Sequence, residues 1–183
     1  KIMVNYISMV LSGSAGFVSM RGVTKSYAGV TALNNVDFRV GAGEAVCLAG
    51  ENGSGKSTLL KILAGVEQPT EGVICIDGLQ KYQLNPRLSA EAGIMVIFQD
   101  FSLFPNLTVA ENISFANQLT RHRKWFRKRN ARVEAKAALE RIGVDIPLEN
   151  RVESLPVAHK QLVAIARALA SKAKLIIMDE PTT

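Results

Sequence analysis

The chain has 183 residues, of which 48% are hydrophobic, so it can bury a sizeable core in one domain or most of one. No apolar run approaches the roughly 18 residues that span a bilayer, which leaves any membrane contact to a partner or to the protein surface. Cys47 and Cys75 each lie in an apolar run, where we expect buried thiols rather than a disulfide framework or a metal site.

The net charge of +6 comes from one segment. Residues 121–132 contain seven basic side chains and no acidic one, whereas the rest of the chain has 15 basic and 16 acidic residues. A basic face spread over the molecule, such as a nucleic-acid backbone requires, is therefore not supported. Because Trp125 and Phe126 lie within this basic segment, three interpretations stay open: a solvated helical face or connector, contact with a membrane surface or acidic partner, or contact with RNA.

The first part of the chain predicts an antiparallel pair of strands. Residues 1–16 have one lysine, a broken apolar stretch and small residues; we expect an N-terminal extension or a cloning remnant rather than a signal peptide. Residues 17–23 predict a strand, residues 25–27 a turn region and residues 32–40 a second strand. On spacing alone, the ring of Tyr27 is either a platform for an adenine base or an ordinary half-buried tyrosine.

The clearest motif is residues 50–58, which read GENGSGKST and fit the template G-x-x-x-x-G-K-[ST]. Glycines let successive backbone N–H groups converge on an anion, the following helix offers its positive end to the same oxygens, and Lys56 adds a full charge. Apolar residues at 45–49 and, with helical spacing, at 59–63 flank the loop and predict strand, phosphate-binding loop and helix. The predicted binding residues are Gly50, Asn52, Gly53, Ser54, Gly55, Lys56, Ser57 and Thr58.

The next elements alternate between strands and helices. Residues 73–77 predict a strand and residues 86–92 a short helix. Residues 94–98 form a continuous apolar run that is typical of a buried parallel strand, and Gln99 follows it at the C-terminal edge. Ligands of such sheets bind at that edge.

Two helical regions occupy the second half of the chain. Thr108 and Glu111 form a capping box that starts a helix. Beyond the basic segment, residues 130–143 predict a helix that closes on a glycine, and residues 158–171 predict another with an apolar face.

The last apolar strand, residues 175–178, delivers two adjacent acids to the same edge as Gln99. Asp179 can hold a hydrated Mg²⁺ that it shares with Ser57, and Glu180 can orient and polarise a water in line with a γ-phosphate. The plainer interpretation of these acids is a solvated strand end.

The order of these motifs resembles that of the ATP-binding cassette (ABC) family of transporter ATPases. GENGSGKST resembles its Walker A motif, IFQD its Q-loop, LIIMDEPT its Walker B motif with the catalytic glutamate, and KSYAGVTAL its adenine-stacking A-loop. The resemblance implies ATP and Mg²⁺ as cofactors and Tyr27 as the adenine platform. It also implies Gln99 as a further Mg²⁺ ligand, with Lys56, Gln99 and Glu180 as the catalytic residues.

The resemblance also implies a fold and a domain organisation. It covers residues 17–183 and implies an α/β P-loop NTPase fold, an ABC-type nucleotide-binding domain with a RecA-like core, an antiparallel β subdomain and a helical subdomain at about residues 105–171. The chain ends directly after the DEPT motif, before the family's D-loop and switch histidine. We therefore expect a cassette that is truncated at its C-terminus.

Residues 85–115 resemble more closely the ATPases of bacterial carbohydrate importers of the ribose, galactose and xylose type. In that group two cassettes are usually fused, and the second commonly lacks the Walker A lysine, so a chain with Lys56 resembles the first. The implied partners are a second cassette, fused or in a homodimer, transmembrane permease subunits and, indirectly, an extracytoplasmic solute-binding protein. The implied location is peripheral, at the cytoplasmic face of the inner (plasma) membrane.

The family's signature, usually L-S-G-G-Q, departs from its pattern here and reads LPVAH at residues 155–159. In the family this segment contacts the γ-phosphate on the opposite cassette through a serine hydroxyl and helix amides. Pro156 has neither a hydroxyl nor an N–H, and His159 replaces the glutamine. Proline suits the first turn of a helix, so we expect the helix to form but the composite site to be weakened. Autoinducer importers relax the same positions, which keeps that substrate open.

Three functions are compatible with these features. The favoured one is an ATP-binding and hydrolysing subunit that powers import of a small solute, most plausibly a sugar. The second is a non-transport ABC ATPase that acts on RNA or DNA, which the basic segment motivates and the Q-loop region disfavours. The third is a nucleotide-binding module with little catalysis, and we expect the chain as given, by itself, to be nearly inactive.

Overall fold

A computed structural model describes residues 8–10, 17–81, 83–98, 101–120 and 128–179, with only the backbone described for residues 8–10 and 116–120. The chain divides into two compact units. The first unit comprises Lys1–Val96 and Lys174–Glu180, and the second comprises Ile97–Ala173 and Pro181–Thr183. None of the helices in the described ranges combines the length and apolar character needed to cross a membrane.

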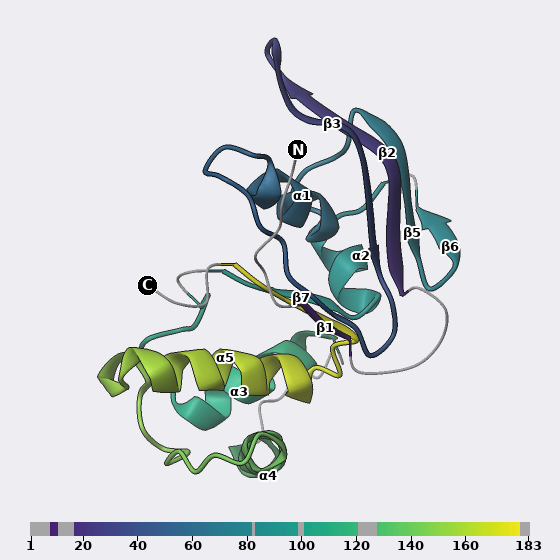
Figure 1. Ribbon diagram of the computed structural model, residues 1–183. Coiled ribbons are helices and arrows are strands. Elements are labelled where there is room, and N and C mark those ends of the chain that lie inside the picture. Colours follow the sequence, from purple (N-terminus) through teal and green to yellow (C-terminus); the bar gives the residue numbers. More distant parts are fainter. Residues whose placement is uncertain (1–7, 11–16, 82, 99–100, 121–127, 180–183) are drawn as a thin grey trace. The chain divides into compact units, whose positions relative to one another are not determined.

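The first unit contains an antiparallel sheet with the strand order β3-β2-β5-β6 (Figure 1). Its strands are β2 (Val18–Tyr27), β3 (Val30–Val40), β5 (Glu71–Ile76) and β6 (Leu79–Lys81). Ala28 and Gly29, with φ values of 37° and 92°, join β2 to β3 in a two-residue turn, because hairpins favour turns with positive φ at both central positions. The predicted turn at residues 25–27 is therefore wrong, since these residues belong to β2.

A second sheet of the first unit has the order β4-β1-β8-β7. Its strands are β4 (Ala45–Val46), β1 (Ser8–Val10), β8 (Leu175–Met178) and β7 (Ile94–Ile97). Strand β1 is antiparallel to both neighbours and pairs Ser8 with Val46 on one side and with Ile177 on the other. Strands β4 and β8 therefore run in the same direction, with β1 between them, a strand that the sequence did not predict.

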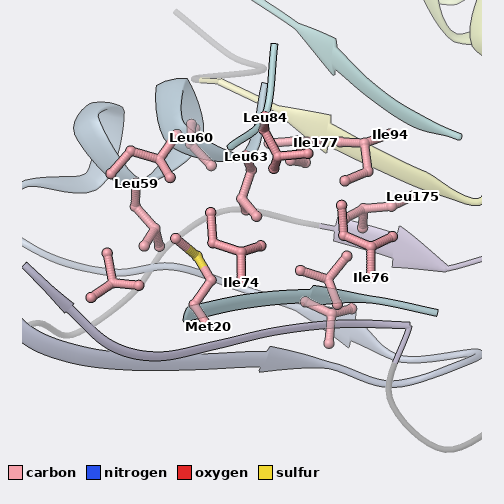
Figure 2. Packing of buried hydrophobic residues seen from close by; sticks show 14 of the residues in the cluster. Met20, Leu59, Leu60, Leu63, Ile74, Ile76, Leu84, Ile94, Leu175 and Ile177 are labelled. Carbon is pink, nitrogen blue, oxygen red and sulfur yellow. The ribbon is translucent and has the colours of Figure 1, made fainter. Parts of the chain in front are cut away.

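Helices α1 (Lys56–Leu63) and α2 (Pro86–Glu91) belong to the same unit. The apolar residues of α1 are buried as their spacing predicts, and they enter one cluster with side chains of both sheets (Figure 2). The labelled members of this cluster are Met20, Leu59, Leu60, Leu63, Ile74, Ile76, Leu84, Ile94, Leu175 and Ile177. Because each fully buried side chain of this size contributes roughly 1.5–3 kcal/mol, the cluster holds α1 firmly against β8 and the antiparallel sheet.

The two cysteines are less buried than predicted. Cys47 is exposed and Cys75 is half-buried. Cys75 alternates along β5 with the buried Ile74 and Ile76, so it lies on the opposite face of the strand. Cys47 follows the last paired residue of β4, at the point where the chain leaves the described ladder. An apolar run therefore did not guarantee a buried thiol at either position.

The second unit is a helical layer with a core of its own. Its elements are α3 (Val109–Thr120), α4 (Lys128–Arg141), η1 (Val152–Ser154) and α5 (Val157–Ala170). The predicted capping box starts α3: the Thr108 N–H donates to Glu111 Oε2 over 2.9 Å, and the Glu111 N–H donates to Thr108 Oγ1 over 3.2 Å. Small side chains, such as Ala135 and Ala166, are fully buried in this core and let the helices approach closely.

A buried arginine of α5 holds the turn at the start of this unit. The Arg167 side chain donates from Nη1 to the Ser102 carbonyl over 2.7 Å and from Nη2 to the Phe101 carbonyl over 2.9 Å. Phe101 and Ser102 have φ values of 58° and 46°, a left-handed conformation that is costly for residues with a side chain. The two hydrogen bonds from Arg167 thus offset the conformational free energy that the left-handed backbone of Phe101 and Ser102 costs.

We predict that Arg167→Met lowers the free energy of unfolding by about 3 kcal/mol, because two carbonyl acceptors lose charge-assisted hydrogen bonds inside the unit. Urea denaturation of the full chain measures the change. Arg87→Met is the matched control, since Arg87 is exposed on α2 and, among the described residues, forms an ion pair with Glu91 one turn away; the stability of this variant should equal that of the unchanged chain. Equal losses in the two variants would contradict the role assigned to Arg167.

Candidate functional site

The glycine-rich loop predicted to bind phosphate lies between β4 and α1. The Ser54 N–H donates to the Glu51 carbonyl over 3.1 Å and closes a turn. Gly53 and Gly55 have φ values of 83° and 89°, a backbone region that residues with a Cβ rarely adopt. The predicted sequence of strand, loop and helix is therefore confirmed, although the described strand is only Ala45–Val46 rather than residues 45–49.

Gly55 brings this loop into direct contact with β3. A Cβ atom at position 55 would lie 2.4 Å from the Ala32 carbonyl oxygen and 2.8 Å from Leu33 Cδ2. Gly53 differs, because a Cβ there would meet no atom within 4 Å. The close approach at Gly55 fixes the start of α1 against the antiparallel sheet.

Helix α1 begins without a side-chain cap from its N-cap residue. Gly55 is its N-cap and provides no side-chain hydrogen bond, and the first turn contains no acidic residue. The free amides and the helix dipole therefore favour an anion at this end. A cavity of about 170 Å³ lies there, and its lining residues are Ala32, Asn52, Gly53, Ser54, Gly55, Lys56, Ser57 and Thr58.

The Lys56 ammonium group is folded over the same loop. It donates to the Gly50 carbonyl, to the Glu51 carbonyl over 2.7 Å and to Ser54 Oγ over 3.3 Å. All three acceptors are neutral, and no carboxylate of the described residues pairs with Lys56. The loop therefore holds a full positive charge beside the free amides of α1, as an anion site requires.

Two predicted magnesium ligands belong to the first unit. Ser57 is exposed in the first turn of α1, and Asp179 is half-buried directly after β8. Nowhere in the described ranges do three or more His, Cys, Asp or Glu side chains form a group that could hold a metal ion. One hydroxyl and one carboxylate fit Mg²⁺, which usually takes one or two protein ligands and fills its octahedron with waters and phosphate oxygens.

Other predicted site residues lie away from this cavity or outside the described residues. Gln99 and Glu180, predicted to bind Mg²⁺ and to activate water, lie outside the residues that the structure describes. Tyr27 ends β2, is 39% exposed and does not line the cavity. Ala32 lines the cavity but was not predicted, because no sequence motif marks an alanine that contributes only the position of its backbone.

A larger hollow of about 610 Å³ lies elsewhere on the antiparallel sheet, next to Arg21, Asp37 and Arg39. It contains no residue of the glycine-rich loop. Volume alone does not select an anion site, whereas converging amides and an ammonium group do. We therefore take the smaller cavity as the candidate site.

The altered signature segment starts α5 in the second unit. Pro156 is the N-cap, with φ −57° and ψ 153°, and its carbonyl accepts the first helical hydrogen bond, from the Lys160 N–H over 3.0 Å. The helix forms as predicted, with proline one position before its first turn. Pro156 gives this helix end no side-chain cap, and His159 is exposed.

Comparison with known families identifies the chain. The model of the ABC transporter family matches residues 33–183. The chain belongs to this family. The "Putative ribose/galactose/methyl galactoside import ATP-binding protein 1" of Rhizobium meliloti is 47% identical over 165 residues, which are 90% of this chain and 32% of that protein. The D-allose import ATP-binding protein AlsA of Escherichia coli is 41% identical over 173 residues, 91% of this chain and 33% of its own length.

Solved structures of the ABC transporter family have the same fold. The dimeric post-hydrolysis structure of the ATP-binding cassette MJ0796, bound to ADP and Pi, matches with a TM-score of 0.71 and 31% identity, over 90% of this chain and 74% of that chain. The α/β cassette fold predicted from the motifs is thereby confirmed. The chain spans about a third of the length of the curated relatives it matches.

We predict that two neighbouring glycines of this ABC cassette differ in their tolerance of alanine. Gly53→Ala should lower the free energy of unfolding by about 1 kcal/mol, which is the cost of a left-handed residue in open space. Gly55→Ala should lower it by about 3–4 kcal/mol, because the same backbone cost is joined by the clash with Ala32. Denaturant unfolding without nucleotide measures both, and equal losses would contradict the close approach at Gly55.

Proposed function

We propose that this chain is the ATP-binding and hydrolysing part of an importer for a small solute of the sugar class. The observation that carries the proposal is the pairing of Lys56 with the uncapped N-terminus of α1 at one cavity. A triphosphate is a multiply charged anion, and this arrangement offers it one full charge and several backbone donors. The names of the two relatives, both import ATP-binding proteins for sugars, support the solute class.

The proposed roles divide the site between binding and hydrolysis. Lys56 and the loop amides hold the phosphates, and Tyr27 stacks on the adenine base. Ser57, Asp179 and Gln99 would hold Mg²⁺, which neutralises phosphate charge when it is bound. Glu180 orients the attacking water as a general base.

We further propose the assembly in which this site works. The partners are a second cassette, fused or in a homodimer, and the transmembrane permease subunits, with an extracytoplasmic solute-binding protein acting indirectly. The chain then acts as a peripheral subunit at the cytoplasmic face of the plasma membrane. The relatives are about three times as long as the stretch they share with this chain, which leaves room in them for a second cassette.

The described part of the basic segment supports transport over a nucleic-acid function. Arg132 donates to Glu149 over 2.7 Å, and this hydrogen bond, more than the charge of Arg132, lowers the pKa of the Glu149 carboxyl. One basic residue of the segment thus already has an acidic partner within the unit. Lys128 and Arg129 are exposed in the first turn of α4, where cations are unfavourable next to the helix dipole but well solvated.

The central prediction separates binding from hydrolysis. Lys56→Ala should raise the Kd for ATP at least about 100-fold, because two or more charge-assisted hydrogen bonds to phosphate are lost. Glu180→Gln should keep the Kd and reduce turnover to about 1% or less, because the amide cannot accept the proton of water. Calorimetry and phosphate release by the full-length protein in its assembled transporter measure the two effects.

A matched carboxylate provides the control for Glu180. Glu71 is exposed on β5, away from the loop, and Glu71→Gln should leave both Kd and turnover unchanged. Undiminished hydrolysis in Glu180→Gln would refute the assignment of the general base. Undiminished ATP binding in Lys56→Ala would refute the site itself.

The signature segment yields a second prediction, which also addresses the weakly catalytic alternative. Pro156→Ser supplies an N-cap hydroxyl and should stabilise α5 by about 1 kcal/mol. If this helix end meets the phosphate on a neighbouring cassette, turnover of the assembled transporter should also rise roughly tenfold, since a charged oxygen gains a hydrogen bond. Pro156→Ala is the control, because it restores the N–H without the hydroxyl. Turnover that does not change in Pro156→Ser would exclude a contact through this position.

A further inference from the structure

Lys25, two residues before Tyr27 on β2, has three interactions that its place in the sequence does not suggest. Its Nζ donates to the Gln68 carbonyl over 2.7 Å and lies 3.0 Å from Glu67 Oε2. The same nitrogen lies over the Tyr27 ring, 4.8 Å from the ring centroid. Its side chain is only 15% exposed, so these contacts are weakly screened by water.

The acceptors of Lys25 belong to the segment that closes α1. The Val66 and Glu67 N–H groups both donate to the Lys61 carbonyl, over 2.9 and 3.2 Å, and so continue from the last turn of the helix. Helix α1 starts at the glycine-rich loop and ends at Leu63. Lys25 therefore ties the Tyr27 end of the hairpin to the far end of the helix whose first turn lines the candidate site.

Neighbouring hydrogen bonds reinforce this link. The Thr70 N–H donates to the Thr24 carbonyl over 2.8 Å, and the Ser26 N–H donates to Thr70 Oγ1 over 3.2 Å. Both strand residues flank Lys25, so the backbone on either side of it is fixed to the same segment. The position of the Tyr27 backbone relative to α1 is thereby set by several hydrogen bonds, and Lys25 adds a contact to the ring itself.

Tyr27 needs such a contact because the residue is 39% exposed at the end of a hairpin. An aromatic side chain that must stack on a ligand loses rotamer freedom on binding, and a protein contact that orients the ring beforehand removes that cost. An ammonium group over one face of the ring is attracted by its quadrupole and leaves the other face for a planar ligand.

We propose that Lys25 is a positioning residue that holds the Tyr27 ring for the base of ATP and so sets the contribution of the base to nucleotide affinity. The inference rests on the proposed function, in which Tyr27 is the adenine platform. It adds a residue that acts through Tyr27 and has no contact with the phosphates. The inference has a selective consequence. Loss of Lys25 lowers the affinity for ligands that carry a base and leaves the affinity for ligands without a base unchanged.

The test compares Mg-ATP with Mg-tripolyphosphate, which has the same charged chain and no base. In Lys25→Met, which keeps most of the packing of the side chain, the Kd for ATP should rise about five- to tenfold while the Kd for tripolyphosphate stays within about twofold. Lys25→Arg should recover most of the ATP affinity, because a guanidinium group also stacks on an aromatic ring. Calorimetry on the unchanged chain and on both variants measures the Kd for each ligand.

The chain offers a matched control for the general loss of such an ion pair. Lys174 Nζ lies 2.6 Å from Asp77 Oδ2 and over the Phe17 ring at 5.5 Å, in the same unit but away from the hairpin end. Lys174→Met should leave the ATP affinity unchanged. An equal loss for ATP and tripolyphosphate in Lys25→Met, or no loss for either, would overturn the inference and leave Lys25 with a purely structural role.

Variants of Tyr27 separate this inference from the function on which it rests. Tyr27→Ala should weaken ATP binding and spare tripolyphosphate, and adding Lys25→Met should cause little further loss, because Lys25 acts through the ring. If Tyr27→Ala leaves the ATP affinity unchanged, the adenine platform itself is wrong. If Tyr27→Ala weakens ATP binding and Lys25→Met does not, only the inference about Lys25 is wrong.

Discussion

The contact between Gly55 and the Ala32 carbonyl is the constraint on which the candidate site depends. It brings the N-cap residue of α1 against β3, and any side chain at position 55 would separate them. Because the apolar cluster fixes the body of α1 against β8 as well, the helix is held at its start and along its buried face. The loop before it then has little freedom, and Gly53 and Gly55 adopt left-handed conformations that direct the backbone around the cavity.

This rigid placement explains how the loop can hold concentrated positive charge. Lys56 donates to neutral oxygens of its own loop, and among the described residues no carboxylate compensates its charge. The amides of the first turn add partial charges in the same place. Concentrated positive charge of this kind is stabilised by a bound anion, so in the proposed function phosphate binding would also stabilise the loop.

Local chemistry accounts for what could be predicted from the sequence. The glycine-rich loop and the capping box at Thr108 and Glu111 involve residues within a few positions of one another, so the local sequence predicts their geometry. The hairpin turn was misplaced by a few residues, because Ala28 and Gly29 are a weak turn signal and residues 25–27 look polar.

Tertiary pairing accounts for most of what could not be predicted. Strand β1 inserts between β4 and β8, and Lys25 finds Glu67 and Gln68 more than forty positions away; both depend on the register of strands that no local pattern encodes. The starts of helices α1 and α5 share a feature that bears on function. Neither Gly55 on α1 nor Pro156 on α5 gives its helix a side-chain cap, an arrangement that favours an anion at both helix starts. In the proposed pair of cassettes, the substitution to proline removes one hydroxyl and one N–H but leaves the amides of residues 157–159, so the α5 contact would be weakened rather than abolished.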